Sequence, residues 1–128
     1  MLLSLSARDL LLIDRLDVEF RPGLCALTGE TGAGKSILLD ALGLALGSRA
    51  ESGLIRPAAE RAQVTAEFEL PGGHPALGLA HVQGLDVEGT LVLRRILTRD
   101  GKSRATLNDQ PVSAGLLRDI GGIIVIDF

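Results

Sequence analysis

The feature that most constrains how this chain can fold is a glycine-rich segment, GETGAGKS, at residues 29–36. Its three glycines allow the backbone to curl so that several N–H groups point inward, which suits them to bind phosphate oxygens. The full pattern GxxxxGK(S/T) requires a strand before it and a helix after it. The apolar runs at 24–28 and 36–46 provide both. The sequence therefore predicts an α/β fold organised around a phosphate-binding loop.

The positions of this loop have separate predicted roles toward a bound nucleoside triphosphate. Lys35 is predicted to contact the β- and γ-phosphates as the catalytic residue of the loop, and Ser36 to place its hydroxyl on Mg²⁺. The predicted cofactors are therefore ATP and Mg²⁺. GTP stays open as an alternative, because the chain has three Phe and no Tyr or Trp to stack on a base. The residues predicted to bind the nucleotide are Gly29, Glu30, Thr31, Gly32, Ala33, Gly34, Lys35 and Ser36.

Composition narrows the class of protein. The chain has 128 residues, 46 % of them hydrophobic, which is enough for one core, so residues 1–128 are expected to form a single domain. The net charge of -3 argues against a protein that coats nucleic acid non-specifically, since such binding needs dense positive charge. A single cysteine, Cys25, excludes an internal disulfide and favours a reducing, cytoplasmic location. Charged residues from Arg8 onward interrupt the apolar N-terminus, so no membrane span is expected there.

Hydrophobic periodicity and turn residues predict the remaining elements. Asp100-Gly101 and Asn108-Asp109 indicate tight turns, and Ser113 is a candidate helix N-cap. Residues 123–126 are apolar throughout and follow two glycines, which favours a buried strand. The predicted strands are 2–7 and 11–20 (an antiparallel pair), 24–28, 63–70, 90–98, 103–107 and 123–126, and the predicted helices are 36–46, 74–83 and 111–120.

Taken with the opening segment LLSLSARDLLLIDRLDVEF, the glycine-rich loop resembles that of the RecN family. These are bacterial double-strand-break repair ATPases related to the heads of structural-maintenance-of-chromosomes (SMC) proteins and to ABC transporters. The resemblance continues through residues 46–70 and 93–122, so it covers about residues 1–122. It implies the N-terminal lobe of an ABC-type ATPase head, with an antiparallel β-subdomain beside a mixed core sheet. Residues 1–128 would then be an incomplete head, without its coiled coil and C-terminal lobe.

The resemblance also implies a function. The chain would be the ATP–Mg²⁺-binding part of a bacterial, cytoplasmic, nucleoid-associated ATPase acting in DNA double-strand-break repair and recombination. Its partners would be the C-terminal lobe of the same protein, a second head in a homodimer, and DNA, with no membrane. In ABC-type ATPases the signature motif of a second head closes over the nucleotide, so this chain alone is expected to bind ATP with little or no hydrolysis. Related repair ATPases carry an arginine near the nucleotide at the position of Arg56, whose guanidinium suits a phosphate.

A basic cluster in the segment 94–104 is a candidate contact for DNA. Five Lys and Arg side chains stand there against the single acid Asp100, in a chain that is acidic as a whole. Neighbouring strand residues such as Arg94 and Arg95 face opposite sides of a sheet, so the cluster is open to being split. The alternative is a solvated hairpin with no ligand. The predicted DNA contacts are Arg99, Lys102 and Arg104.

Two other functions stay open from the residues alone. Asp127 ends the apolar run 123–126, which is the pattern of a Walker B acid in a free-standing P-loop NTPase or kinase. The chain could instead be a DNA-binding module whose nucleotide only sets its conformation. Turnover by the chain alone would favour the first, and nucleotide-independent DNA binding the second. His74 and His81 are expected on the surface, because no cysteine or carboxylate cluster lies near them to complete a metal site.

Overall fold

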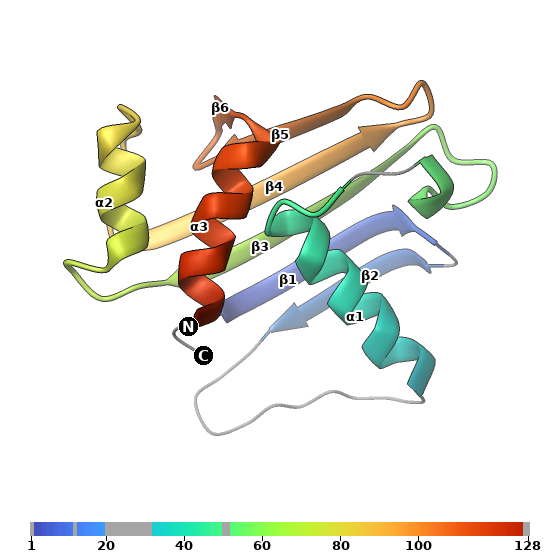
Figure 1. Ribbon diagram of the computed structural model, residues 1–128. Coiled ribbons are helices and arrows are strands. Elements are labelled where there is room, and N and C mark those ends of the chain that lie inside the picture. The colour runs from blue at the N-terminus through green and yellow to red at the C-terminus, as the bar shows by residue number, and fades with distance from the viewer. Residues whose placement is uncertain (1, 12, 20–31, 50–51, 127–128) are drawn as a thin grey trace.

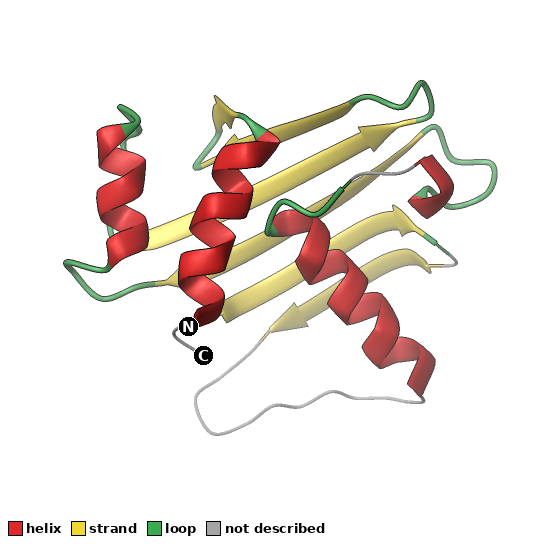
Figure 2. Ribbon diagram, viewed as in Figure 1, coloured by secondary structure: helices red, strands yellow, loops and turns green. Residues whose placement is uncertain are grey.

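The computed structural model describes residues 2–11, 13–19, 32–49 and 52–126, and for residues 32–36, 52, 125 and 126 it covers the backbone only. Six strands form one antiparallel sheet in the order β2-β1-β3-β4-β5-β6. Helices α1 and α3 lie across the same face of this sheet, with α2 beside α3 (Figures 1 and 2). The strands are β1 (Leu2–Leu10), β2 (Ile13–Glu19), β3 (Arg61–Glu69), β4 (Thr90–Thr98), β5 (Ser103–Leu107) and β6 (Gln110–Val112). The helices are α1 (Gly32–Ala45), the short 3₁₀ helix η1 (Ser52–Leu54), α2 (Pro75–Val82) and α3 (Ala114–Ile126).

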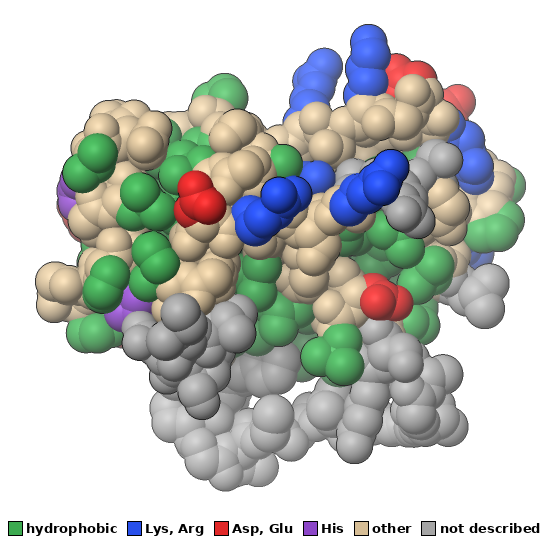
Figure 3. Space-filling view, in the orientation of Figure 1, with side chains coloured by type: hydrophobic (Ala, Val, Ile, Leu, Met, Phe, Trp, Pro, Cys, Tyr) green, Lys and Arg blue, Asp and Glu red, His purple; other side chains and the backbone are tan. Residues whose placement is uncertain are grey.

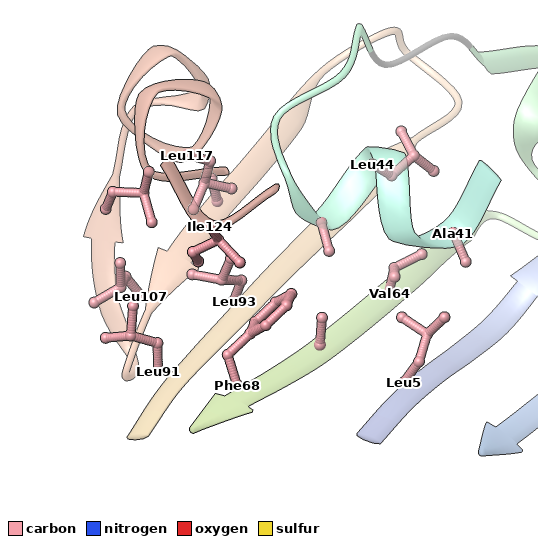
Figure 4. Close-up of a cluster of buried hydrophobic side chains, with 14 of the residues drawn as sticks. Leu5, Ala41, Leu44, Val64, Phe68, Leu91, Leu93, Leu107, Leu117 and Ile124 are labelled. Atoms are coloured by element: carbon pink, nitrogen blue, oxygen red, sulfur yellow. The ribbon is translucent and has the colours of Figure 1, made fainter. Parts of the chain in front are cut away.

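Alternation of apolar and polar residues along the strands places the core on the helix-covered face. In β3, Val64, Ala66 and Phe68 are fully buried, while the residues between them are half-buried on the opposite face. Ala66 pairs with Leu93 of β4, and Phe68 pairs with Leu91, so the buried side chains of the two strands lie side by side (Figure 4). The predicted antiparallel β-subdomain is confirmed. The expected mixed core sheet is not seen among the described strands, and the predicted strand at 24–28 lies outside the described residues.

The hairpins follow the turn residues closely. Strands β4 and β5 have the bounds predicted from the Asp100-Gly101 turn. Asn108 and Asp109 both adopt positive φ, +49° and +65°, as a type I′ turn requires. The Asn108 side chain also accepts a hydrogen bond from the Val92 backbone N–H at 2.7 Å and donates one to the Thr90 carbonyl at 3.1 Å. These bonds connect the turn to the start of β4.

Helix α3 corrects one prediction. Residues 123–126, predicted as a strand, continue the helix that Ser113 caps through a 3.0 Å hydrogen bond from the Leu116 N–H. Gly121-Gly122 does not end the helix, because Gly121 packs directly against Leu46, just after α1, where a β-carbon would lie 2.8 Å from the Leu46 carbonyl oxygen. Side chains at helical spacing then bury the rest of α3, namely Leu117, Ile120 and Ile124.

His74 is a second correction. It is buried rather than exposed, because its Nδ1 accepts a 3.0 Å hydrogen bond from the Ala76 N–H and so caps the start of α2. His81 is exposed, as predicted. No helix among the described residues is long and apolar enough to cross a membrane.

Candidate nucleotide site

Helix α1 begins at Gly32, so Gly34, Lys35 and Ser36 lie within its first five residues. This confirms the helix that the phosphate loop requires on its C-terminal side. The first N–H groups of a helix lack intrahelical partners and carry the positive end of the helix dipole, which favours an anion. The first turn contains no acidic residue that would oppose a phosphate.

Other parts of the predicted loop are not located by the structure. Gly29, Glu30 and Thr31 lie outside the described residues, and Lys35 and Ser36 are described by their backbone alone. Their contacts with phosphate and Mg²⁺ therefore stay predictions. Among the described residues, no group of three or more His, Cys, Asp or Glu side chains is arranged to hold a metal ion.

The sheet holds α1 through its buried side. Ala41, Leu44 and Ala45 are at most 2 % exposed and pack over β1, β3 and β4 (Figure 4). On its outer side α1 is mixed, since Leu39 is 69 % exposed and the acidic residue Asp40 next to it is exposed as well.

The C-terminal end of α1 is fixed by a complete Schellman motif. The Gly47 N–H donates to the Leu44 carbonyl at 3.1 Å, and the Ser48 N–H donates to the Gly43 carbonyl at 2.9 Å. Gly47 has φ of +97°, the conformation that this motif requires. A β-carbon at Gly47 would lie 2.4 Å from the Arg118 backbone nitrogen, so α3 packs against this end of α1.

Arg95 reaches the same end of α1 from β4. Its side chain is buried at 2 % exposure, and Nη1 donates to the carbonyls of Leu44 at 3.0 Å and Ser48 at 2.9 Å. Burial, and to a smaller extent the positive charge of Arg118, lowers the pKa of Arg95. From the sequence, Arg95 was expected only as a member of the basic cluster. Its place in the alternation of Leu91, Leu93 and Leu97 was the signal that it faces the core.

Arg56 lies beside the turn that joins β1 and β2. Its Nη1 is 3.6 Å from Asp9 Oδ1 and 3.4 Å from Asp14 Oδ1, and its backbone N–H donates to the Asp9 carbonyl at 2.7 Å. Arg99 holds the same loop from the β4–β5 turn, donating to the carbonyls of Ala59 at 2.6 Å and Arg56 at 2.9 Å. The predicted contact of Arg56 with nucleotide is not tested by these bonds.

The basic cluster is split, as the alternation of strand residues allowed. Arg95 is buried, whereas Arg94 lies on the opposite face of the sheet, near Asp109 at 3.5 Å. Lys102 and Arg104 are exposed and form no ion pair with any described carboxylate. Lys and Arg side chains project from the edge of the molecule over β5 (Figure 3). Of the three predicted DNA contacts, Arg99 is therefore bound to the chain itself, and the other two face solvent.

The structure also bears on the Walker B alternative. Asp127 lies outside the described residues, but the segment 123–126 before it is helical. The buried strand that a Walker B acid follows is therefore not present at this place. A surface hollow of about 470 Å³ lies at α2, lined by residues between Gly72 and Gly89, and includes no residue of α1.

Comparison with known proteins agrees with this architecture. The family model described as AAA domain matches residues 4–112. The chain is 41 % identical over 128 residues to the DNA repair protein RecN of Haemophilus influenzae, covering 98 % of this chain and 23 % of that protein. It is 44 % identical over 126 residues to RecN of Halalkalibacterium halodurans, covering 98 % of this chain and 22 % of that protein. The chain thus spans less than a quarter of the length of these curated relatives.

A solved structure places the fold among SMC ATPase heads. It comes from work on ATP-driven dimerization and DNA-stimulated activation of SMC ATPases, and it superposes with a TM-score of 0.74 at 23 % sequence identity. The match covers 97 % of this chain and 79 % of that chain. At this identity the likeness establishes the fold. Together with the sequence matches, it shows that this chain belongs to the AAA domain family and resembles RecN DNA repair proteins over nearly its whole length.

Proposed function

We propose that this chain is the ATP–Mg²⁺-binding part of a RecN-like ATPase that acts in bacterial DNA double-strand-break repair and recombination. The observation that carries the proposal is the complete motif GETGAGKS leading into α1, on a chain 41 % identical to a RecN protein. Lys35 would contact the β- and γ-phosphates, Ser36 would ligate Mg²⁺, and Arg56 would lie near the nucleotide. The other nucleotide contacts would come from the loop, at Gly29, Glu30, Thr31, Gly32, Ala33 and Gly34.

The proposed site is half of a catalytic site. The chain spans 23 % of its H. influenzae relative, so most of the whole protein would lie outside residues 1–128. We infer that the C-terminal lobe of the same protein completes the head, and that a second head closes over the nucleotide in a homodimer. A bacterial repair ATPase of this kind would work in the cytoplasm, on the nucleoid.

Titration of ATP–Mg²⁺ into the isolated chain, followed by hydrolysis assays with and without the C-terminal lobe, tests this proposal. The chain alone is expected to bind ATP with little or no turnover, because the groups that complete the site come from elsewhere. Turnover should appear when the C-terminal lobe is added. Steady turnover by the chain alone would instead favour a free-standing NTPase.

DNA is a proposed partner of the full-length protein, with Lys102 and Arg104 as contacts. Both side chains are exposed at the β4–β5 hairpin. Arg99 is a poorer choice for mutation, because its loss would also release the two carbonyls of residues 56 and 59. Phosphate contacts of this kind position DNA without reading its sequence.

Replacing Lys102 and Arg104 by alanine in the full-length protein is expected to weaken DNA binding and reduce its dependence on salt. Each lost phosphate contact reduces the magnitude of the slope of log affinity against log salt by about 1. The slope of the double variant should therefore be smaller in magnitude by about 2. Fluorescence anisotropy with labelled duplex DNA, over a series of salt concentrations, measures the affinity and its dependence on salt. The double variant Arg8→Ala, Arg15→Ala is the control, because it removes two positive charges near the opposite edge of the sheet. Equal effects of the two double variants would contradict a contact at the hairpin.

A further inference from the structure

Arg95 is a buried cation whose hydrogen bonds go mainly to backbone carbonyls. Nη1 donates to the carbonyls of Leu44 and Ser48, and Nη2 donates to Ser103 Oγ at 3.3 Å. No described carboxylate forms an ion pair with it. An apolar residue at this position would continue the row of Leu91, Leu93 and Leu97 without the cost of burying a charge. A packing role alone therefore does not explain an arginine here.

The partner of this charge is the C-terminal end of α1. The last carbonyls of a helix have no intrahelical donor, and together they carry the negative end of the helix dipole. Leu44 lies in the last turn of α1, and Ser48 is the last residue of the Schellman motif that ends the helix. Arg95 therefore binds α1 to the central strand β4 at the end opposite to the phosphate loop.

The same end of α1 is also held from the side of α3. Gly47 lies against the Arg118 backbone, and Gly121 lies against Leu46, with no room for a β-carbon at either glycine. The C-terminal end of α1 is thus fixed by β4 and by α3. A helix of 14 residues is about 20 Å long and rigid, so a small tilt at the fixed end moves the other end, where Lys35 and Ser36 lie, by about an ångström or more.

We propose that Arg95 is a positioning residue for the nucleotide phosphates, acting through α1. It sets the direction of the helix whose N-terminal end carries Gly34, Lys35 and Ser36. A misplacement of about 1 Å is enough to disrupt a site that depends on several aligned donors. This inference rests on the proposed binding of ATP at the loop, and it assigns to Arg95 a role that neither the motif nor the relatives indicate.

The test measures the affinity of the 128-residue chain for ATP–Mg²⁺ in the variants Arg95→Met and Arg95→Lys. Methionine fills similar apolar volume and removes every hydrogen bond to α1, so affinity should fall about tenfold or more. Lysine keeps the positive charge and can still donate hydrogen bonds, so Arg95→Lys should lose less affinity for ATP than Arg95→Met does. Circular dichroism in a urea series gives the folded fraction of each variant, and every dissociation constant is corrected to folded molecules.

Leu91→Ala is the matched control. Leu91 is fully buried on the same strand and face, but it lies near Leu107 and away from Leu44 (Figure 4). It should lower stability by leaving a cavity, and its folded molecules should bind ATP as the wild type does. If Arg95→Met does not fold, Arg95→Lys carries the comparison, with a smaller loss expected.

Two outcomes would overturn the inference alone: unchanged affinity of the folded Arg95 variants, or an equal loss in Leu91→Ala. A wild-type chain that binds no ATP would overturn the proposed function and this inference with it. The titration of the wild-type chain therefore tells the two failures apart.

Discussion

Replacing Lys35 by alanine is expected to abolish measurable binding of ATP–Mg²⁺ while the chain remains folded. The lysine is predicted to supply the one side-chain cation of the loop that reaches the β- and γ-phosphates. Charge-assisted hydrogen bonds of this kind are stronger than neutral ones, and removing one leaves phosphate charge without its partner. We expect a loss of about a hundredfold or more in affinity, measured by isothermal titration calorimetry.

The chain contains a matched control for this variant. Its other lysine, Lys102, lies in an identical tripeptide, Gly101-Lys102-Ser103, on an exposed hairpin. Lys102→Ala changes the net charge by the same amount and should leave ATP affinity unchanged. Thermal unfolding followed by circular dichroism checks that both variants are folded. A well-folded Lys35→Ala chain with wild-type affinity would remove the phosphate loop from the proposed site.

Local sequence signals were sufficient where the structure depends on local geometry. The β4–β5 hairpin was predicted with its observed bounds, because the Asp100-Gly101 turn and the alternation of the two strands are local features. The helix after the phosphate-loop motif was predicted for the same reason, since the motif and the apolar run that follows it are continuous in the chain. Its resemblance to RecN proteins was confirmed by identities of about 40 %.

Contacts between distant segments account for what the sequence did not predict. Gly121-Gly122 has the composition of a helix end, but Gly121 is where α3 crosses Leu46 of the α1 end, so the helix continues. Arg95 is one of several arginines in sequence, and its role depends on α1 lying over β4. His74 was expected on the surface, but its ring caps α2. In each case the partner of the residue, and not its own type, decides what it does.

Gly47 provides the second large effect, and it tests the packing of α1 against α3 directly. Alanine at this position would have to adopt φ near +97°, and its β-carbon would meet Arg118 backbone atoms at 2.4 and 2.7 Å. The left-handed backbone costs an alanine about 1 to 2 kcal/mol, and overpacking adds about 1 to 3 kcal/mol. We expect Gly47→Ala to lower the free energy of unfolding by about 3 kcal/mol or more, a large part of the stability of a domain this size.

Gly101 separates the two contributions to this effect. It has a similar backbone angle, φ of +85°, but a β-carbon there would have no atom within 4 Å. Gly101→Ala therefore introduces the backbone strain alone and should cost about 1 to 2 kcal/mol. Urea unfolding of both variants, monitored by circular dichroism, gives the two free energies. The clash at Gly47 exists only if α3 lies against the C-terminal end of α1. Equal losses of stability in the two variants would therefore mean that the two helices do not meet there. The C-terminal end of α1 would then be held by β4 alone.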